Sequence, residues 1–296
     1  MLTTTKIPLG YIIKSTWLDM LMVFFVSVMM YEIYSVIDLT NIPVSITALI
    51  GTSISLVLAF KLGQSYDRWW EARKVWGSIV NDSRSLIIQV KNFTQSKDLM
   101  LLEKIAFRQI GWCYSFGQSL RGFSPFDNLE GLLSKEELEE IKKHENVGLA
   151  LLDRHAGDLV KLKQAGLISD FQYMQIDQTI VRLCTSMGQA ERIKKTVFPT
   201  AYRLFLHFFI YIFVVMLSNT LAETDGIYEI PILMMIISPF FLLEKTAYFL
   251  QDPFENRPTD IAVTSIARSI EVNIRQLINK GNNTSVEAND SSYYVM

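Results

Sequence analysis

The segment Ile42–Phe60 (IPVSITALIGTSISLVLAF) constrains the fold most, because it contains no charged residue. At 1.5 Å per helical residue, it is long enough to cross a hydrocarbon core of roughly 30 Å. A second apolar run of similar length, Leu18–Ile37, precedes it. Pro43 fits the first turn of a helix, where its missing N–H is not needed. We therefore predict a transmembrane hairpin.

Two further apolar segments occur much later in the chain. Leu204–Leu221 is apolar and aromatic, and Ile230–Leu243 is shorter and contains Pro231 and Pro239. Half of the 296 residues are hydrophobic, which is high for a soluble protein of this length. The alternative is a large soluble core, but buried helices of soluble proteins usually carry a polar stripe. We expect an all-α membrane protein with four transmembrane helices.

The distribution of basic residues indicates the orientation. Lys and Arg are absent from the two short links between paired spans, and the link after Leu221 carries only acidic charges. The positive-inside rule then places both termini and the long middle region in the cytoplasm of a multi-pass protein of the cell (inner) membrane. Lys6 and Lys14 precede the first apolar run as in a signal peptide, but no small-residue cleavage site follows, so we expect this segment to be retained.

The middle region has mixed charge, with apolar residues at helical spacing, which predicts a helical bundle and no sheet. Helix breaks are expected at residues 122–128 and at Gly166. The predicted organisation, in chain order, is a cytosolic N-terminus (1–17), a first transmembrane hairpin (18–60), a cytosolic helical region (61–202), a second transmembrane hairpin (203–250), a cytosolic C-terminal helix (251–279) and a disordered tail (280–296).

A charged helix is predicted within the middle region at SKEELEEIKKHE. Ser134 and Glu137 fit a capping box that opens this helix. Glu136 and Glu140 are expected on a solvated face with i,i+4 pairing. This pattern implies no catalytic role.

No pattern in the chain indicates an enzyme. Cys113 and Cys184 lack CxxC spacing, and the three histidines are not at ligand spacing. There is no phosphate loop and no nucleophile elbow. The net charge of −2 offers no basic excess for a nucleic acid. We expect no catalytic activity, no cofactor, no metal site and a free, reduced pair of cysteines.

An aromatic and basic cluster follows the uncharged segment, at YDRWWEARKVWG. Amphipathic rings of this kind anchor helices at a membrane interface while neighbouring charges reach water. The anchor residues are Tyr66, Arg68, Trp69, Trp70 and Arg73, with Trp76 expected beside them. Glu32, near the outer end of the first span, either marks a polar pathway or reaches headgroup water.

Three blocks carry a family resemblance: LGQSYDRWWEARKVWGSIVNDSR, GLISDFQYMQIDQTIVRLCTSMGQAERIKKTVFPTAYRL and LQDPFENRPTDIAVTSIARSIEVNIRQL. In this order, and between two membrane hairpins, they resemble bacterial bestrophin homologues. The resemblance implies a ring-shaped homo-pentameric ion channel with one central pore, made of a membrane neck and a wide cytosolic vestibule. By this resemblance, the neck positions are Thr52, Leu56 and Phe60, and a cytosolic aperture falls on Phe171.

Two departures from the family pattern affect the expected behaviour. The first neck ring is usually a larger aliphatic residue, so the hydroxyl of Thr52 is expected to ease hydration and make the gate leakier. Animal relatives bind Ca²⁺ through an acidic run, whereas Arg257 interrupts the run here and leaves the degenerate clasp positions Asp252 and Asp260. We expect no Ca²⁺ activation.

Several functions remain open. Passive conduction of anions, chiefly chloride, is what the resemblance implies first. Conduction of monovalent cations such as sodium is the alternative within the same architecture, because an apolar neck carries no fixed sign. A non-conducting membrane scaffold is a third possibility. A secondary transporter has less support, because no clear pair of discontinuous helices is visible.

Overall fold

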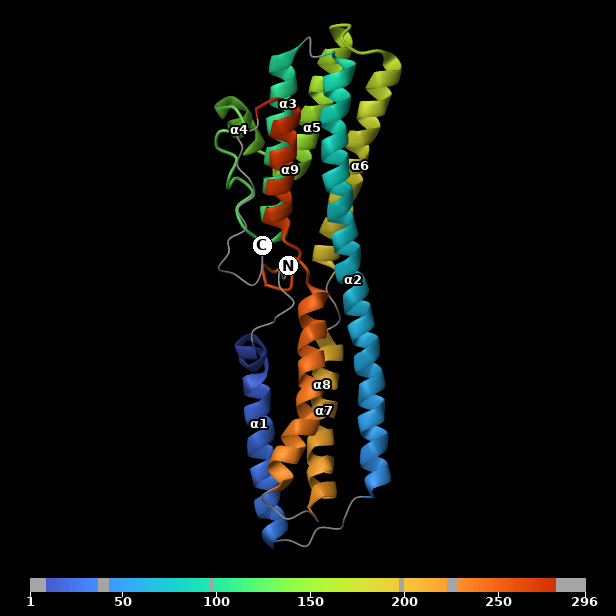
Figure 1. Cartoon of the computed structure of the whole chain (residues 1–296), viewed down its shortest axis with the longest axis vertical. Coiled ribbons are helices and arrows are strands. Elements are labelled where there is room, and N and C mark those ends of the chain that lie inside the picture. Colours follow the sequence, from blue (N-terminus) through green and yellow to red (C-terminus); the bar gives the residue numbers. More distant parts are fainter. Residues whose placement is uncertain (1–8, 37–42, 96–97, 197–199, 223–227, 281–296) are drawn as a thin grey trace. The chain divides into compact units, whose positions relative to one another are not determined.

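A computed structural model describes residues 9–36, 43–95, 98–196, 200–222 and 228–280 (Figure 1). Within these ranges the chain is helical, and its only extended pairing is an isolated bridge between Glu130 and Leu133. The helices are α1 (Leu9–Val36), α2 (Val44–Phe93), α3 (Leu99–Leu120), α4 (Lys135–Ile141), α5 (Val147–Gln164), α6 (Asp170–Lys195), α7 (Thr200–Leu221), α8 (Glu229–Gln251) and α9 (Val263–Leu277).

The chain divides into two compact units. The membrane unit comprises the described residues of 4–69 and 197–252, and the extramembrane unit comprises those of 70–196 and 253–296. Four helices are long and apolar enough to cross a bilayer, with spans at Lys14–Ile33, within Val44–Phe93, at Tyr202–Leu221 and at Glu229–Gln251. The prediction of four membrane helices is therefore confirmed. The predicted disordered tail (280–296) lies outside the described residues except for Lys280.

Helix α2 belongs to both units and is longer than predicted. It runs for 50 residues without interruption, so the predicted boundary between residues 60 and 61 falls inside one continuous helix. No proline occurs between Val44 and Phe93, and nothing else in this stretch removes a backbone hydrogen bond. The appearance of charged residues from Lys61 onward therefore does not mark the end of a helix.

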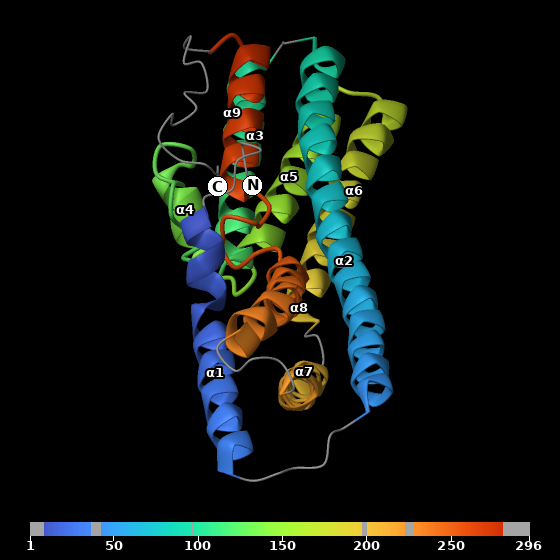
Figure 2. The same ribbon diagram turned by 60° about the horizontal axis from the view of Figure 1, so that its bottom comes forward.

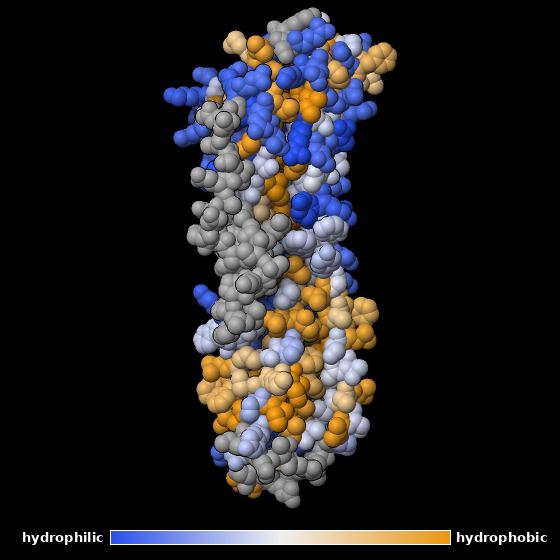
Figure 3. Space-filling view, viewed as in Figure 1, coloured by the Kyte–Doolittle hydropathy of each residue, from blue (hydrophilic) through white to orange (hydrophobic). Residues whose placement is uncertain are grey.

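The membrane unit is held together by apolar packing between its helices, and its outer surface is also largely apolar (Figure 3). Gly51 permits a close approach of α2 to the Phe213 side chain on α7, because a Cβ at this position would lie 2.9 Å from Cζ of Phe213. The buried core residues are Val23, Ile54, Leu58, Leu206, Ile210, Phe213, Val214, Leu233, Ile237 and Phe241. This packing fixes one face of α2 against the bundle.

The extramembrane unit is a bundle in which α3 lies beside both α5 and α9, and α5 beside α6 (Figures 1 and 2). Trp76 is completely buried here and stacks on Phe116, with ring centroids 5.9 Å apart. Phe116 also stacks on Trp112, whose indole N–H donates to the carbonyl of Gly148 at 3.0 Å. The expectation that Trp76 belongs to the interfacial anchor is wrong, because it packs in this aromatic core.

The predicted helix breaks are confirmed. Helix α3 ends at Leu120, and the loop that follows contains Gly122 and Asn128 with φ of 75° and 67°. Helix α5 ends at Gln164, before Gly166 with φ of 67°. Glycine and asparagine tolerate this left-handed conformation better than other residues do. Both cysteines are free, as expected.

Helix α4 begins as predicted but makes different contacts. The Ser134 side chain accepts a hydrogen bond from the N–H of Glu137 at 3.2 Å. The carboxylate of Glu137 does not complete the capping box, because it binds Arg108 on α3. Glu140 pairs with Arg154 on α5, so the prediction of i,i+4 pairing is wrong for this residue. Both acids join α4 to its neighbours.

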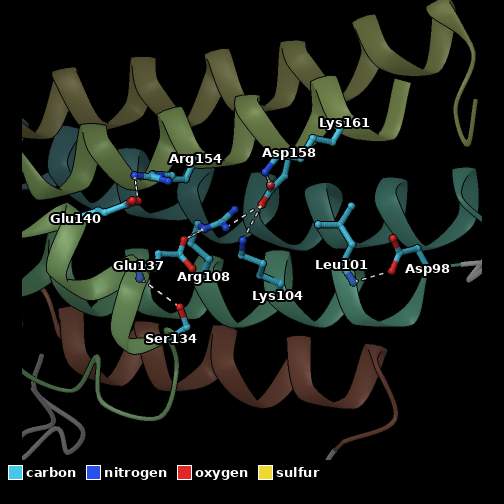
Figure 4. Close-up of polar contacts among 10 residues, drawn as sticks. All are labelled: Asp98, Leu101, Lys104, Arg108, Ser134, Glu137, Glu140, Arg154, Asp158 and Lys161. Atoms are coloured by element: carbon cyan, nitrogen blue, oxygen red, sulfur yellow. Dashed lines mark hydrogen bonds and ion pairs between the residues drawn. The ribbon is translucent and has the colours of Figure 1, made fainter. Parts of the chain in front are cut away.

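Arg108 is the centre of a buried charged cluster (Figure 4). Its Nε donates to Glu137, and its Nη2 lies 2.8 Å from Oδ2 of Asp158 on α5. Lys161 approaches the other oxygen of Asp158 at 2.8 Å. Burial alone would raise the pKa of Asp158, but the hydrogen bonds from Lys161 and Arg108 and the charges of Arg108 and Lys104 bring it below its ordinary value. One arginine thus connects three helices.

Replacing Arg108 should strongly destabilise the extramembrane unit. Arg108→Met leaves the buried carboxylate of Glu137 without its cation and leaves Asp158 with only its lysine partners, which costs about 3–5 kcal/mol of the free energy of unfolding. Arg154→Met, which breaks the half-exposed pair with Glu140, should cost about 1 kcal/mol or less. Melting temperatures of the purified proteins in detergent would measure the difference. Equal shifts of the melting temperature in the two variants would contradict the central role of Arg108 in the buried cluster.

Candidate functional site: the exposed face of helix α2

One side of α2 is buried in the membrane unit. Its buried residues recur at alternating spacings of three and four, at Gly51, Ile54, Leu58, Lys61 and Ser65. Since successive helical residues are turned by about 100°, these positions share one side of the helix. Ile54 and Leu58 pack into the apolar core described above. The side of α2 that faces the bundle is therefore defined.

Thr52, Leu56 and Phe60 lie on the opposite side, about half a turn around the helix from the buried side. Leu56 and Phe60 are 58% and 63% exposed, and Thr52 is exposed as well. The three residues carry no charge. The structure thus brings the three predicted neck positions onto one uncharged surface that the chain itself leaves uncovered.

The hydroxyl groups along this part of α2 are bonded to their own helix. Thr52 Oγ1 donates to the carbonyl of Ala48, Ser53 Oγ to Leu49 and Ser55 Oγ to Gly51, each at 2.8 Å. These bonds use the hydroxyl protons and leave the oxygen lone pairs as acceptors. The exposed surface of α2 therefore offers oxygen acceptors and apolar groups to a water or an ion.

A buried ion pair lies behind this surface, and the sequence analysis missed it. Nζ of Lys61 is 3.0 Å from Oε1 of Glu244 on α8, and the two side chains are 1% and 2% exposed. His207 on α7 lies between Glu244 and Asp19 of α1, with nitrogen–oxygen separations of 3.8 and 3.7 Å. The available signal was a single basic residue directly after an uncharged span and a single acid at the end of another.

The predicted anchor residues come next along α2. Tyr66 stacks on Trp69 with ring centroids 6.1 Å apart, and Tyr66 and Trp70 are half-exposed. Nη2 of Arg68 lies 3.9 Å from Oδ1 of Asp252. Arg73 is partly buried one turn after Trp69. Asp252, one of the two degenerate clasp positions, is thus engaged by an arginine.

Asp260, the other clasp position, closes its own loop. Its Oδ2 accepts hydrogen bonds from the backbone N–H groups of Glu255 at 2.7 Å and Arg257 at 3.0 Å. The side chain is almost fully buried, and this burial raises its pKa above the ordinary value despite those bonds. In the described part of the chain, no three His, Cys, Asp or Glu side chains are grouped so that they could hold a metal.

Phe171 lies in the first turn of α6, in the extramembrane unit, and is 86% exposed. A capping box between Ser169 and Gln172 begins this helix, and the sequence analysis did not predict it. Met174 and Val181, three and ten residues further on, are also exposed. Their spacing places them on the same side of α6 as Phe171. This exposed apolar side is compatible with the predicted aperture position.

Comparison with known proteins decides the family. The model of the bacterial and fungal bestrophin proteins matches residues 1–276. The chain belongs to the bestrophin family. Its fold is shared with the crystal structure of a bacterial bestrophin homologue from Klebsiella pneumoniae, with a TM-score of 0.83, 25% sequence identity, and coverage of 89% of this chain and 98% of the other.

Curated relatives of this bestrophin are named as voltage-dependent anion channel-forming proteins. The protein YneE of Escherichia coli K12 is 29% identical over 242 residues, covering 81% of this chain and 78% of the relative. A protein of Ralstonia nicotianae is 28% identical over 245 residues, covering 82% and 78%. The prediction of a multi-pass membrane protein of a channel-forming family, and not an enzyme, is confirmed.

Micromolar Ca²⁺ should leave the current through this bestrophin unchanged. The carboxylate of Asp260 already accepts hydrogen bonds from backbone N–H groups, and Asp252 lies beside Arg68. Neither carboxylate is therefore free to supply the several oxygens that Ca²⁺ needs. Currents through purified protein in planar bilayers, measured in buffered Ca²⁺ and then in chelator, would test this. A steep rise of current with Ca²⁺ would contradict it.

Proposed function

We propose that copies of this bestrophin assemble around an axis into an anion channel, chiefly for chloride, whose membrane neck is lined by Thr52, Leu56 and Phe60. The observation that carries the proposal is the exposed, uncharged side of α2, which faces away from the chain's own core. The anion channel-forming relatives supply the ion class.

A single helix face cannot enclose a pore, so the proposal requires several copies related by cyclic symmetry. The family resemblance favours five. Small residues flank the stripe, since Ser53 and Ser55 lie beside Thr52 and Leu56, and this allows neighbouring helices to approach closely. Their hydroxyls are satisfied within α2, so packing them against another copy leaves no unpaired donor.

The neck would gate by dewetting. An ion that passes a ring of leucine and phenylalanine side chains gives up part of its hydration without receiving compensating dipoles. Phe60 could also present the positive edge of its ring to an anion. Thr52 would be the most easily hydrated ring of the three, because its oxygen remains available as an acceptor.

The remaining predicted features fit this arrangement. We place both termini and the extramembrane unit in the cytoplasm of the cell membrane, on the positive-inside pattern of the links. The aromatic residues from Tyr66 to Trp70 would then lie at the cytoplasmic interface, and Phe171 would form a second constriction in the vestibule.

Monovalent cation conduction is the alternative that a specific observation favours. The hydroxyls of α2 direct their oxygens and not their protons outward, and an oxygen acceptor suits a cation better than an anion. A non-conducting scaffold remains the third candidate, because the exposed apolar side of α6 offers a contact surface.

Reversal potentials separate these candidates. In a NaCl gradient across a planar bilayer, we expect the reversal potential of the purified protein to shift toward the chloride equilibrium potential. A shift toward the sodium equilibrium potential would establish the cation channel. Intact oligomers without any ion flux in liposomes would favour the scaffold.

Shortening the neck side chains should change conduction. Leu56→Ala with Phe60→Ala removes the apolar constriction, so we expect a larger single-channel conductance or open probability. Leu204 and Phe208 on α7 offer a matched control, because they are the same residue types at the same spacing and are also exposed. Their double alanine variant should conduct as the unchanged protein does. Unchanged currents in the α2 variant would remove the neck assignment.

A further inference from the structure

The ion pair of Lys61 and Glu244 is unusual for its position. A lysine near the end of a membrane helix normally extends along the helix so that its amino group reaches the headgroups. Lys61 instead turns inward, is 1% exposed, and meets Glu244 at 3.0 Å. Glu244 is also within reach of His207, which in turn approaches Asp19. The cluster therefore draws one polar side chain from each of the four membrane helices.

Stability alone does not account for such a pair. A buried ion pair gains little over well-packed apolar residues, because removing both charges from water offsets most of their attraction. Breaking it by removing one partner is costly, since the remaining charge is left buried. Such an ion pair mainly determines how the helices are placed, because it forms in one arrangement of the helices and destabilises the others.

The ion pair of Lys61 and Glu244 determines the direction in which the exposed face of α2 points. Lys61 directly follows Phe60, so the two side chains are turned by about 100° from one another. The same rotation places Leu56 about 140° and Thr52 about 180° from Lys61. With the amino group held at α8, the three predicted neck side chains point away from the bundle.

Apolar contacts do not fix this rotation as closely. Ile54 and Leu58 pack into the core without the directional requirement of a hydrogen bond, whereas the close approach of Gly51 to Phe213 limits how far α2 can turn. A modest turn of α2 about its axis would keep much of this buried area. It would separate Lys61 from Glu244, whose contact depends on both distance and direction.

We propose that Lys61 and Glu244, supported by His207 and Asp19, form a latch that sets the rotation of α2 and so keeps Leu56 and Phe60 directed into the pore. Lys61 is in this sense a positioning residue and does not itself line the ion pathway. The inference rests on the proposed function, because it concerns the neck defined there.

Cysteine accessibility tests the latch directly. In a Cys184→Ser background, Leu56→Cys should react with a charged, water-soluble thiol reagent, and the reaction should reduce the current. The neighbouring Val57→Cys, turned by about 100°, should react severalfold more slowly. Lys61→Met with Glu244→Met removes both charges and leaves no buried ion unpaired, so this double variant should assemble.

In the double variant, we expect the reaction rate at Leu56→Cys to fall severalfold, that at Val57→Cys to rise, and single-channel conductance to change. The exchanged pair, Lys61→Glu with Glu244→Lys, should restore the original reaction pattern. Lys245→Met is the control, because it removes a neighbouring positive charge on α8 without touching the pair. It should leave the pattern unchanged.

The outcomes separate the two proposals. An assembled double variant with the original reaction pattern and conductance would overturn the latch while leaving the neck assignment in place. So would failure of the exchanged pair to restore a pattern that the double variant had altered. Absence of any reaction at Leu56→Cys in the protein with the intact pair would overturn the neck assignment, and the latch with it.

Discussion

Polar groups buried in the membrane unit must find partners on neighbouring helices, and the rest of the structure depends on this constraint. Hydrocarbon offers no water to solvate them. Lys61 of α2 meets Glu244 of α8, and Thr47 of α2 lies 2.9 Å from Thr220 of α7. Ser218 of α7 donates to Glu229 of α8 at 2.5 Å. Each contact joins two helices at defined positions, and together they leave a defined side of α2 unpacked.

The extramembrane unit also buries charged groups, but some of their partners are exposed side chains. Arg108 is buried between the carboxylates of Glu137 and Asp158. The exposed side chains of Lys104 and Lys161 extend toward Asp158. Burial lowers the pKa of His155 to about 3, with the charge of Arg108 acting in the same direction, so this residue is neutral at physiological pH. The charge of the buried cluster is thus balanced in part by Lys104 and Lys161, whose side chains reach water. Lys61 and Glu244 can rely only on groups within the bundle, which makes their alignment more demanding.

The sequence was sufficient for features that depend on local pattern. The four spans follow from length and composition, the breaks at Gly122 and Gly166 from residue type, and the shared side of Thr52, Leu56 and Phe60 from helical periodicity. The choice of this stripe over others came from the family resemblance. No local pattern could reveal the contacts of Lys61 with Glu244 or of Glu137 with Arg108, because the partners lie 183 and 29 residues apart. The burial of Trp76 was missed for the same reason, since its partners are on α3.

Gating and ion selectivity depend on different parts of the proposed channel. The side chains of the neck carry no charge, and the proton of the Thr52 hydroxyl is already donated to Ala48. The charge that directly follows Phe60 in the chain, on Lys61, is compensated by Glu244 at 3.0 Å and would act on an ion as a dipole. In the proposed channel, the neck would set mainly the cost of dehydration, which applies to an ion of either sign. The preference for one sign would then arise mainly from the exposed charges of the wider parts of the pathway, whose field accumulates ions before they reach the constriction.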